Sequence, residues 1–260
     1  MRRFLLIMMS LALLCGVTKP EYAHADSLRR KEVVLKKCKS FAKQVTKENT
    51  TYIIKHDFNL KGKIITIPKG SVLIFDGGSV YGGILKGEKM PSNNVYTPEM
   101  FGADRTRKDN DALQSALNIC NHIQMDGNYK VFANSKNRDN ACLLVPSNTN
   151  IELNGVIYYE TPTLESYCIF MVYGASDVSI SGTGKLIGDK SFHNGTTGEW
   201  GHGISVYHSK NVLVEGVECS NLWGDAIYMY YGSPVCENVK IRNVFLHDCR
   251  RQGVSVTGGR

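Results

Sequence analysis

The sequence predicts an all-β protein, a single-stranded right-handed parallel β-helix, and two observations carry this prediction. Residues 150–155, 177–182, 211–216 and 238–243 each begin with Asn or Asp, place aliphatic residues two apart, and end in Gly or Asn. This pattern recurs at intervals of 27, 34 and 27 residues. Such a period is typical of a solenoid, whose coils bury their apolar faces only against neighbouring coils. Alternation with period two indicates strands.

A second strand follows each of these segments, beginning at Cys168, Gly203, Ala226 and Gly253. The aliphatic residues of this strand are predicted to point into the core, namely Ile169, Ile204, Ile227 and Val254, with Met171, Val206, Met229 and Val256. Two outward columns remain. One holds Phe170, Ser205, Tyr228 and Ser255, and the next holds Val172, Tyr207, Tyr230 and Thr257. Neighbouring tyrosines either offer a platform for sugar rings or stabilise the sheet surface.

Residues 1–25 are predicted to be a secretory signal peptide. Arg2 and Arg3 precede an apolar run over residues 4–17, and small residues at Ala23 and Ala25 offer a cleavage site. A membrane anchor is the alternative, but the run is shorter than the ~20 residues that a span needs. We therefore expect an exported protein that is secreted, periplasmic or at the cell surface. It should have no membrane span after signal cleavage.

The rest of the chain divides into two parts. Residues 26–50 are basic and are predicted to form a helical or partly ordered arm, because Val34, Cys38, Phe41 and Val45 lie at helical spacing. Residues 51–260 form the predicted β-helix. Its helical pattern over residues 106–123 is expected to be an N-terminal capping helix over an open end of the core.

The last predicted strand is followed almost at once by the end of the sequence. A solenoid needs a polar cap over its last coil, and residues 257–260 cannot supply one. We therefore expect a β-helix that is truncated at the C-terminus, with end-to-end assembly as the alternative. The oligomeric state is not predicted.

Composition and charge limit the classes of partner and site that the chain can have. Hydrophobic residues make up 42% of the chain and charged residues 21%, which is ordinary for a globular protein. The formal charge of +7 suits an acidic polysaccharide but also a solvated basic helix face. No nucleic-acid-binding motif is present, so no nucleic-acid partner is expected. The cysteines form no CxxC pair, and no metal site is predicted.

Candidate site residues gather at one corner of the coils, just before the second strand. The corner position itself is occupied by Tyr167, His202, Asp225 and Gln252. Around it lie Glu199, Trp200, Trp223, Asp248, Arg250 and Arg251, and an insertion over residues 188–201 lengthens one coil there. Loops on a rigid scaffold are common functional sites. The alternatives are purely structural roles, in which a corner Asp caps a turn and the arginines form surface ion pairs.

These residue types suit saccharide chemistry. One carboxyl group can protonate a leaving oxygen while another activates water or attacks. We assign catalytic roles to Asp225, Asp248, Glu199, His202 and Arg251. We assign substrate binding to Trp200, Trp223, Tyr228, Tyr230, Arg250 and Gln252.

Several motifs resemble known families. Thr97-Pro-Glu-Met-Phe-Gly-Ala, followed by the helical segment from Asp109, resembles the opening of the pectin-lyase-like superfamily of β-helix proteins. Gly201-His-Gly resembles the Gly-His-Gly motif of polygalacturonase-type glycoside hydrolases, which implies that His202 is a site residue. Gly224-Asp-Ala-Ile resembles their Asp-Asp-Cys-Ile motif, although the two motifs stand in reversed order here. The segments around Trp223 and Arg250 are similar to uncharacterised Bacteroidetes β-helix proteins.

The sequence thus predicts an exported carbohydrate-active protein, a glycoside hydrolase that cleaves a polysaccharide in a groove on the β-helix without a cofactor. A polysaccharide lyase acting on a uronate polymer is one alternative. It would use Arg251 as base or charge neutraliser and Ca²⁺ held by carboxylates. A non-catalytic glycan-binding or tailspike-like surface protein is the other alternative.

Overall fold

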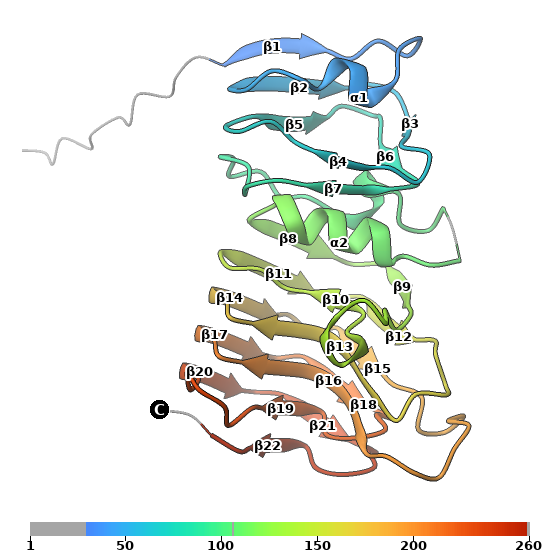
Figure 1. The fold of residues 1–260 in the computed structure, drawn as a ribbon, viewed down its shortest axis with the longest axis vertical. Helices are drawn as coiled ribbons and strands as arrows, with labels where there is room; N and C mark the ends of the chain where they lie inside the picture. The colour runs from blue at the N-terminus through green and yellow to red at the C-terminus, as the bar shows by residue number, and fades with distance from the viewer. Residues whose placement is uncertain (1–29, 106, 259–260) are drawn as a thin grey trace, which may run out of the picture.

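The protein is a solenoid of parallel strands, shown in Figure 1 with its long axis vertical. This computed structural model describes residues 30–105 and 107–258. The predicted signal peptide, residues 1–25, lies outside the described residues. No helix among those that are described is long and apolar enough to cross a bilayer.

From residue 122 onward, each coil contributes one strand to each of three five-stranded parallel sheets. The first sheet holds β8 (His122–Met125), β11 (Thr149–Leu153), β14 (Ser176–Ser181), β17 (Lys210–Glu215) and β20 (Glu237–Arg242). The second holds β9 (Asn128–Val131), β12 (Val156–Tyr159), β15 (Lys185–Ile187), β18 (Glu218–Ser220) and β21 (Phe245–His247). The third holds β10 (Leu143–Leu144), β13 (Ser166–Tyr173), β16 (Trp200–Tyr207), β19 (Ile227–Met229) and β22 (Val254–Val256). The predicted fold class is confirmed.

The N-terminal coils extend the same stack. Their strands are β1 (Lys31–Val34), β2 (Thr50–Ile54), β3 (Phe58–Asn59), β4 (Ile64–Thr66), β5 (Val72–Phe75), β6 (Val80–Tyr81) and β7 (Ile84–Lys86). β1 pairs with β2 in parallel, so the basic segment joins the solenoid as a strand instead of forming a helical arm. Among residues 30–50 of this segment, helix is confined to α1 (Phe41–Gln44), in which Phe41 is buried together with the following Val45.

Helix α2 (Asn110–Ile119) lies within the stack, between β7 and β10, and does not cap an end as predicted (Figure 1). Its side chains form the hydrogen bonds to the neighbouring strands that the backbone of a strand would otherwise form. Ser115 Oγ accepts the Leu85 amide at 3.0 Å, and Asn118 donates to the Leu85 carbonyl at 2.8 Å. On the other side, Gln114 bonds both the amide and the carbonyl of Leu144, at 2.8 and 3.0 Å. The helix thus stands in for one strand. Two short 3-10 helices, η1 (Pro98–Phe101) and η2 (Arg138–Asn140), complete the structure.

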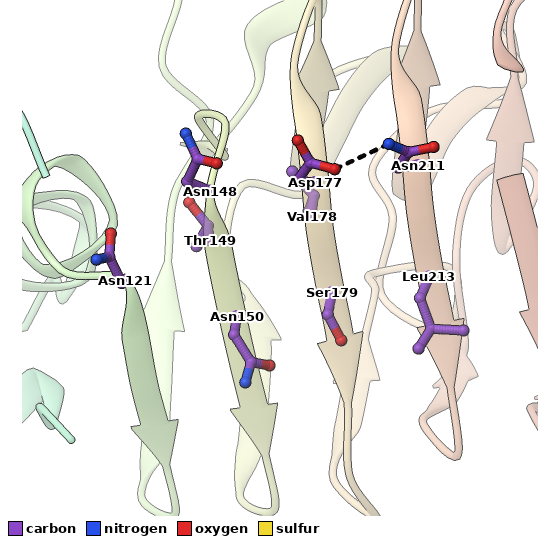
Figure 2. A pocket seen from close by; sticks show the side chains of 9 residues that line it. All are labelled: Asn121, Asn148, Thr149, Asn150, Asp177, Val178, Ser179, Asn211 and Leu213. Atoms are coloured by element: carbon purple, nitrogen blue, oxygen red, sulfur yellow. Dashed lines mark hydrogen bonds between the residues drawn. The ribbon is translucent and has the colours of Figure 1, made fainter. Parts of the chain in front are cut away.

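The Asn or Asp that opens each repeat forms a polar ladder at one corner. Asn148, Asp177, Asn211 and Asn238 all have positive φ, which short polar side chains tolerate best among non-glycine residues. Asn211 donates to Asp177, and Asn238 donates to Asn211, each at 2.8 Å. Figure 2 shows three of these residues along a shallow hollow. The strand register makes Asn148, and not Asn150, the first member of this ladder.

The register of the third sheet corrects one prediction. Phe170 pairs with Ile204, so Phe170 and Val172 occupy the inward columns in which we placed Ile169 and Met171. Ile169 is nevertheless buried in the core, as predicted, and Met171 is not part of it. The outward columns are therefore Met171, Ser205, Tyr228 and Ser255, and beside them Tyr173, Tyr207, Tyr230 and Thr257. The error arose because β13 is apolar and buried on both faces, so period-two alternation cannot tell the faces apart.

Candidate functional site

His202 and Asp225 form the centre of the candidate site. Ile204 pairs with Ile227 in the third sheet, which places the residues two positions earlier, His202 and Asp225, side by side on adjacent coils. The imidazole Nδ1 of His202 accepts the backbone amide of Asp225 at 3.2 Å. Burial lowers the pKa of His202, and the Asp225 charge opposes this effect only in part. The ring is therefore neutral near pH 7. Its Nδ1 also lies 3.3 Å from the Asp225 carbonyl oxygen, so it faces both backbone groups of that residue.

The Asp225 carboxylate is buried, with 1% of the residue exposed. Its Oδ1 accepts the Gln252 amide at 3.0 Å and lies 3.6 Å from Nε of Arg251. Its Oδ2 has no hydrogen-bond partner among the described residues. A buried acceptor without a partner costs free energy, so this oxygen is suited to a ligand or a bound water.

Arg251 joins Asp225 to a second carboxylate. Its Nη1 lies 3.0 Å from Oε1 of Glu199, a residue of the insertion before β16. The guanidinium thus bridges two acidic side chains from different coils. Because Glu199 is half exposed, it can reach solvent, whereas Asp225 cannot. Four of the five predicted catalytic residues therefore gather here, and Gln252 contributes its backbone.

Aromatic rings continue the site along the outer face of the third sheet. Tyr228 stacks on His202 at 4.8 Å with an interplanar angle of 7°. Tyr207 and Tyr230 stack at 4.6 Å and 11°, and Tyr173 lies 6.1 Å from Tyr207. The predicted column of outward tyrosines, which we call the aromatic wall, is therefore present. It also includes Tyr173, which we did not predict because we had placed Val172 at that position.

A loop over residues 132–141 supplies residues that sequence reasoning missed. The Arg138 guanidinium lies over the rings of Tyr173 and Tyr207, at 5.0 and 5.4 Å. Burial, together with the nearby Asp139 carboxylate, raises the pKa of Tyr207 above its usual value. Asp139 itself has a φ of 48°, an unusual backbone conformation of the kind that clusters at functional sites. In the sequence, the run of polar and charged residues at 134–140 could have indicated this loop.

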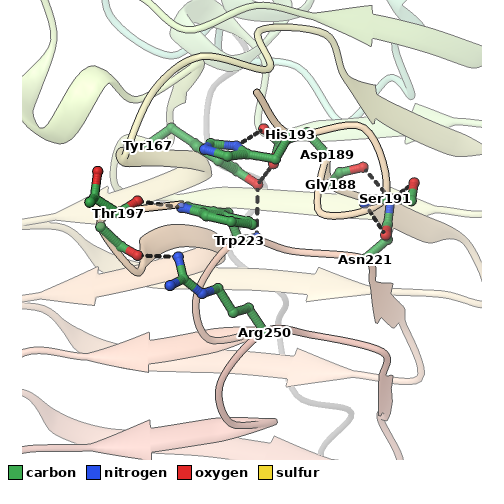
Figure 3. Close-up of polar contacts among 10 residues, drawn as sticks. Tyr167, Gly188, Asp189, Ser191, His193, Thr197, Asn221, Trp223 and Arg250 are labelled. Atoms are coloured by element: carbon green, nitrogen blue, oxygen red, sulfur yellow. Dashed lines mark hydrogen bonds and ion pairs between the residues drawn. The ribbon is translucent and has the colours of Figure 1, made fainter. Parts of the chain in front are cut away.

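Trp223 is not the exposed platform that we predicted. His193 stacks on one face of its indole at 3.6 Å and 11°, and the Arg250 guanidinium covers the other at 4.0 Å (Figure 3). The indole Nε1 donates to the Thr197 carbonyl at 3.2 Å. Arg250 also donates to the carbonyls of Thr196 and Gly198. Trp223 and Arg250 therefore clamp the insertion to the solenoid, and neither offers a free face to a sugar.

A buried network anchors the same insertion. Asp189 is fully buried and accepts the Tyr167 hydroxyl at 2.5 Å, while its other oxygen lies 2.6 Å from Nδ1 of His193 (Figure 3). The Tyr167 oxygen in turn accepts the Trp223 amide at 3.2 Å. The segment after this anchor carries Glu199 and Trp200. Trp200 is 50% exposed and remains available to a ligand.

Asp248 does not belong to the cluster. It has a φ of 54° directly after β21, the position that Asn221, with a φ of 57°, occupies after β18. Its side chain is 77% exposed and pairs with His247 at 2.7 Å. The turn needs a left-handed residue at this point, which explains the aspartate. The structure therefore does not bring Asp248 into the cluster, and Glu199 is the carboxylate linked to Asp225 through Arg251.

Among the described residues, no group of three or more His, Cys, Asp or Glu side chains could hold a metal ion.

These observations define a parallel β-helix whose third sheet carries a polar cluster and an aromatic wall. A family profile described as right-handed β-helix region matches residues 121–260, and the chain belongs to this family. It is similar to two Bacillus subtilis (strain 168) proteins. The SPbeta prophage-derived uncharacterized protein YorA is 33% identical over 132 residues, covering 44% of this chain and 22% of YorA. The uncharacterized protein YclG is 29% identical over 137 residues, covering 46% and 23%.

The chain thus spans less than a quarter of the length of these curated relatives. No solved structure matches it. The resemblance to polygalacturonase-type hydrolases stays a prediction.

Proposed function

We propose that the protein is an exported carbohydrate-active protein that binds a polysaccharide along the third sheet and hydrolyses its glycosidic bonds. The observation that carries this proposal is the buried Asp225 carboxylate, whose Oδ2 is left without a partner among the described residues. Buried polar groups are normally satisfied, so an exception needs an explanation such as a catalytic role or a bound water. The adjoining tyrosines provide ring faces of the kind on which sugars stack.

Glycoside hydrolysis uses two carboxyl groups with different roles, and Asp225 and Glu199 form such a pair, joined by Arg251. One of the two carboxyl groups, Asp225 or Glu199, is assigned to protonate the leaving glycosidic oxygen. The other is assigned to activate a water molecule or to attack the sugar. Arg251 contacts both groups and sets their relative position. It acts as a positioning residue because it touches the carboxylates and not the bond that breaks.

Substrate contacts are assigned to the aromatic side chains that remain accessible. Tyr228 and Tyr230 line the wall beside His202, and Trp200 stands exposed at the start of β16. Rings at several successive coils allow a polymer to lie along the solenoid axis. Gln252 borders the cluster on the next coil.

A non-catalytic glycan-binding protein, tailspike-like in its role, is the second candidate. The name of YorA describes that relative as prophage-derived, which favours a surface role of this kind. The lyase alternative is less favoured. Arg251 is paired with the carboxylates of Glu199 and Asp225, which leaves it poorly placed to serve as a base.

The test is digestion of a panel of acidic and neutral polysaccharides by the wild type, Asp225→Asn and Glu199→Gln. Asp76→Asn is the matched control because Asp76 forms an exposed ion pair with Lys55 on a distant coil. We expect new reducing ends, lost by about 10²-fold or more in Asp225→Asn with an unchanged circular dichroism spectrum. Full activity in that variant would refute the assignment. Ultraviolet absorbance of an unsaturated uronate, abolished by a chelator, would establish a Ca²⁺-dependent lyase. Binding without any product would establish the glycan-binding alternative.

A further inference from the structure

A hollow beside helix α2 lies on the same face as the candidate site. It has a volume of about 520 Å³, which falls within the range of small-molecule sites. Its apolar surface comes from Leu144, Pro146 and Met171, and the half-exposed ring of Tyr173 borders it. The polar part comes from α2 and from the loop over residues 132–141. This combination of a ring face, an apolar floor and a polar rim suits a sugar residue.

A second hollow of about 440 Å³ continues the first toward the N-terminal coils. The two share the four lining residues Asn118, Lys136, Asn137 and Leu144. The second adds Lys86 from β7 and Gln114 from α2. Together they form one groove, which we call the α2 groove, that runs along the solenoid axis.

The charges in the α2 groove are mainly positive. Lys136 and Arg138 line the first hollow, and no carboxylate is among the described residues that line it. Lys86 and Lys136 line the second, together with one acidic residue, Asp111. Asp139 lies 3.7 Å from Arg138 and offsets part of its charge. Cations clustered in a concave surface raise the local concentration of anions.

The α2 groove is connected to the candidate site by the tyrosine column. Tyr173 borders the first hollow and is followed on successive coils by Tyr207 and Tyr230. The Arg138 guanidinium lies over two of these rings, so a cationic group stands directly at the aromatic wall. Tyr207 is buried in this column, so a bound chain would meet the half-exposed ring of Tyr173 and the Arg138 guanidinium together.

We propose that the α2 groove binds a stretch of an anionic, uronate-bearing polysaccharide, with Arg138 and Lys136 holding its carboxylates and Tyr173 a ring face. This inference rests on the proposed function, since it names the substrate class of the same face. An arginine fork suits carboxylate recognition, whereas a neutral glycan offers no negative charge with which the two cations could pair.

The test measures binding separately from cleavage. All variants are made in the Asp225→Asn background, and retardation is measured by affinity electrophoresis in gels containing polygalacturonate. The double variant Arg138→Gln/Lys136→Gln removes both cations. The matched control Lys210→Gln/Lys240→Gln removes two exposed lysines from the first sheet, on another face. Tyr173→Ala tests the ring face independently of charge, and thermal unfolding checks each fold.

We expect roughly tenfold weaker polygalacturonate binding in the double variant and little change in the control, because two exposed charge contacts together contribute on the order of that factor. Binding of the unsubstituted groove should also weaken with added salt. Unchanged affinity in the double variant would overturn the inference. So would equally tight binding of neutral dextran or of a single-stranded DNA oligonucleotide. If binding follows the expected pattern but the wild type cleaves nothing, polysaccharide binding by the α2 groove would stand and the proposed hydrolase activity would be refuted.

Discussion

Replacing Asp189 by Ala should destabilise the insertion that carries Glu199 and Trp200. The Asp189 carboxylate is fully buried, and its two oxygens lie 2.5 Å from the Tyr167 hydroxyl and 2.6 Å from His193 Nδ1. The substitution leaves a buried hydroxyl and a buried imidazole without their acceptor. It also frees His193 from the position in which it stacks on Trp223.

The expected cost is large because each buried donor left without an acceptor costs about 1–3 kcal/mol, and the substitution leaves two such donors. We take about 4 kcal/mol. With a urea m-value of ~3 kcal/mol/M, the unfolding midpoint falls by roughly 1.3 M. The control Asp76→Ala removes an exposed ion pair to Lys55 and should cost no more than about 1 kcal/mol.

The assay is urea unfolding followed by tryptophan fluorescence in a Trp200→Phe background. The chain has two tryptophans, so Trp223 becomes the sole reporter and senses the clamp directly. Because coils of a solenoid can unfold separately, circular dichroism is recorded in parallel. A midpoint within about 0.3 M of the parent, with unchanged Trp223 emission, would refute the view that Asp189 anchors the insertion.

Two further predictions concern the stack itself. Lys89 donates to the carbonyls of Leu117 and Cys120 at 2.5 and 2.7 Å, and burial lowers its pKa from 10.5 to about 8. The unfolded chain therefore keeps this proton between pH 8 and 10.5 while the fold releases it, so stability from this group rises with pH across that window. The difference in unfolding free energy between wild type and Lys89→Met should rise likewise, and a flat difference would contradict the assignment. Gly155→Ala should cost at least about 2 kcal/mol, because its Cβ would lie 1.9 Å from the Gly127 carbonyl oxygen of the preceding coil. The control Gly77→Ala meets no atom within 4 Å and should cost only about 1 kcal/mol through its positive φ, as measured by thermal unfolding.

The solenoid was predictable because its signals repeat. A corner Asn or Asp with positive φ precedes a strand that alternates in polarity, and this combination returns in every later coil. Repetition failed as a guide to side-chain direction where both faces of a strand are buried. The outer face of β13 is covered, with Cys168 and Met171 packed in a small cluster with Ala141 from the adjoining loop. Phe170 and Ile169 therefore look alike in the sequence.

The candidate site was predictable in part for the same reason. His202 and Asp225 align because the strands that follow them are in register, and strand register can be read from aliphatic spacing. Side-chain direction within turns cannot be read in this way. Trp223 and Asp248 both lie in such turns, and their surroundings depend on contacts with residues far away in the sequence, such as Thr197 for Trp223.

The two irregular segments of the chain explain where its chemistry is concentrated. A regular coil places the same kind of residue at the same point again and again, as the polar ladder of the first sheet does. A site that combines unlike groups therefore needs residues from outside the repeat. Arg138 and Asp139 come from the loop over residues 132–141, and Glu199 comes from the clamped insertion. Both segments lie along the third sheet, so it is this face that departs from the repeat and that has the variety of side chains a specific ligand requires.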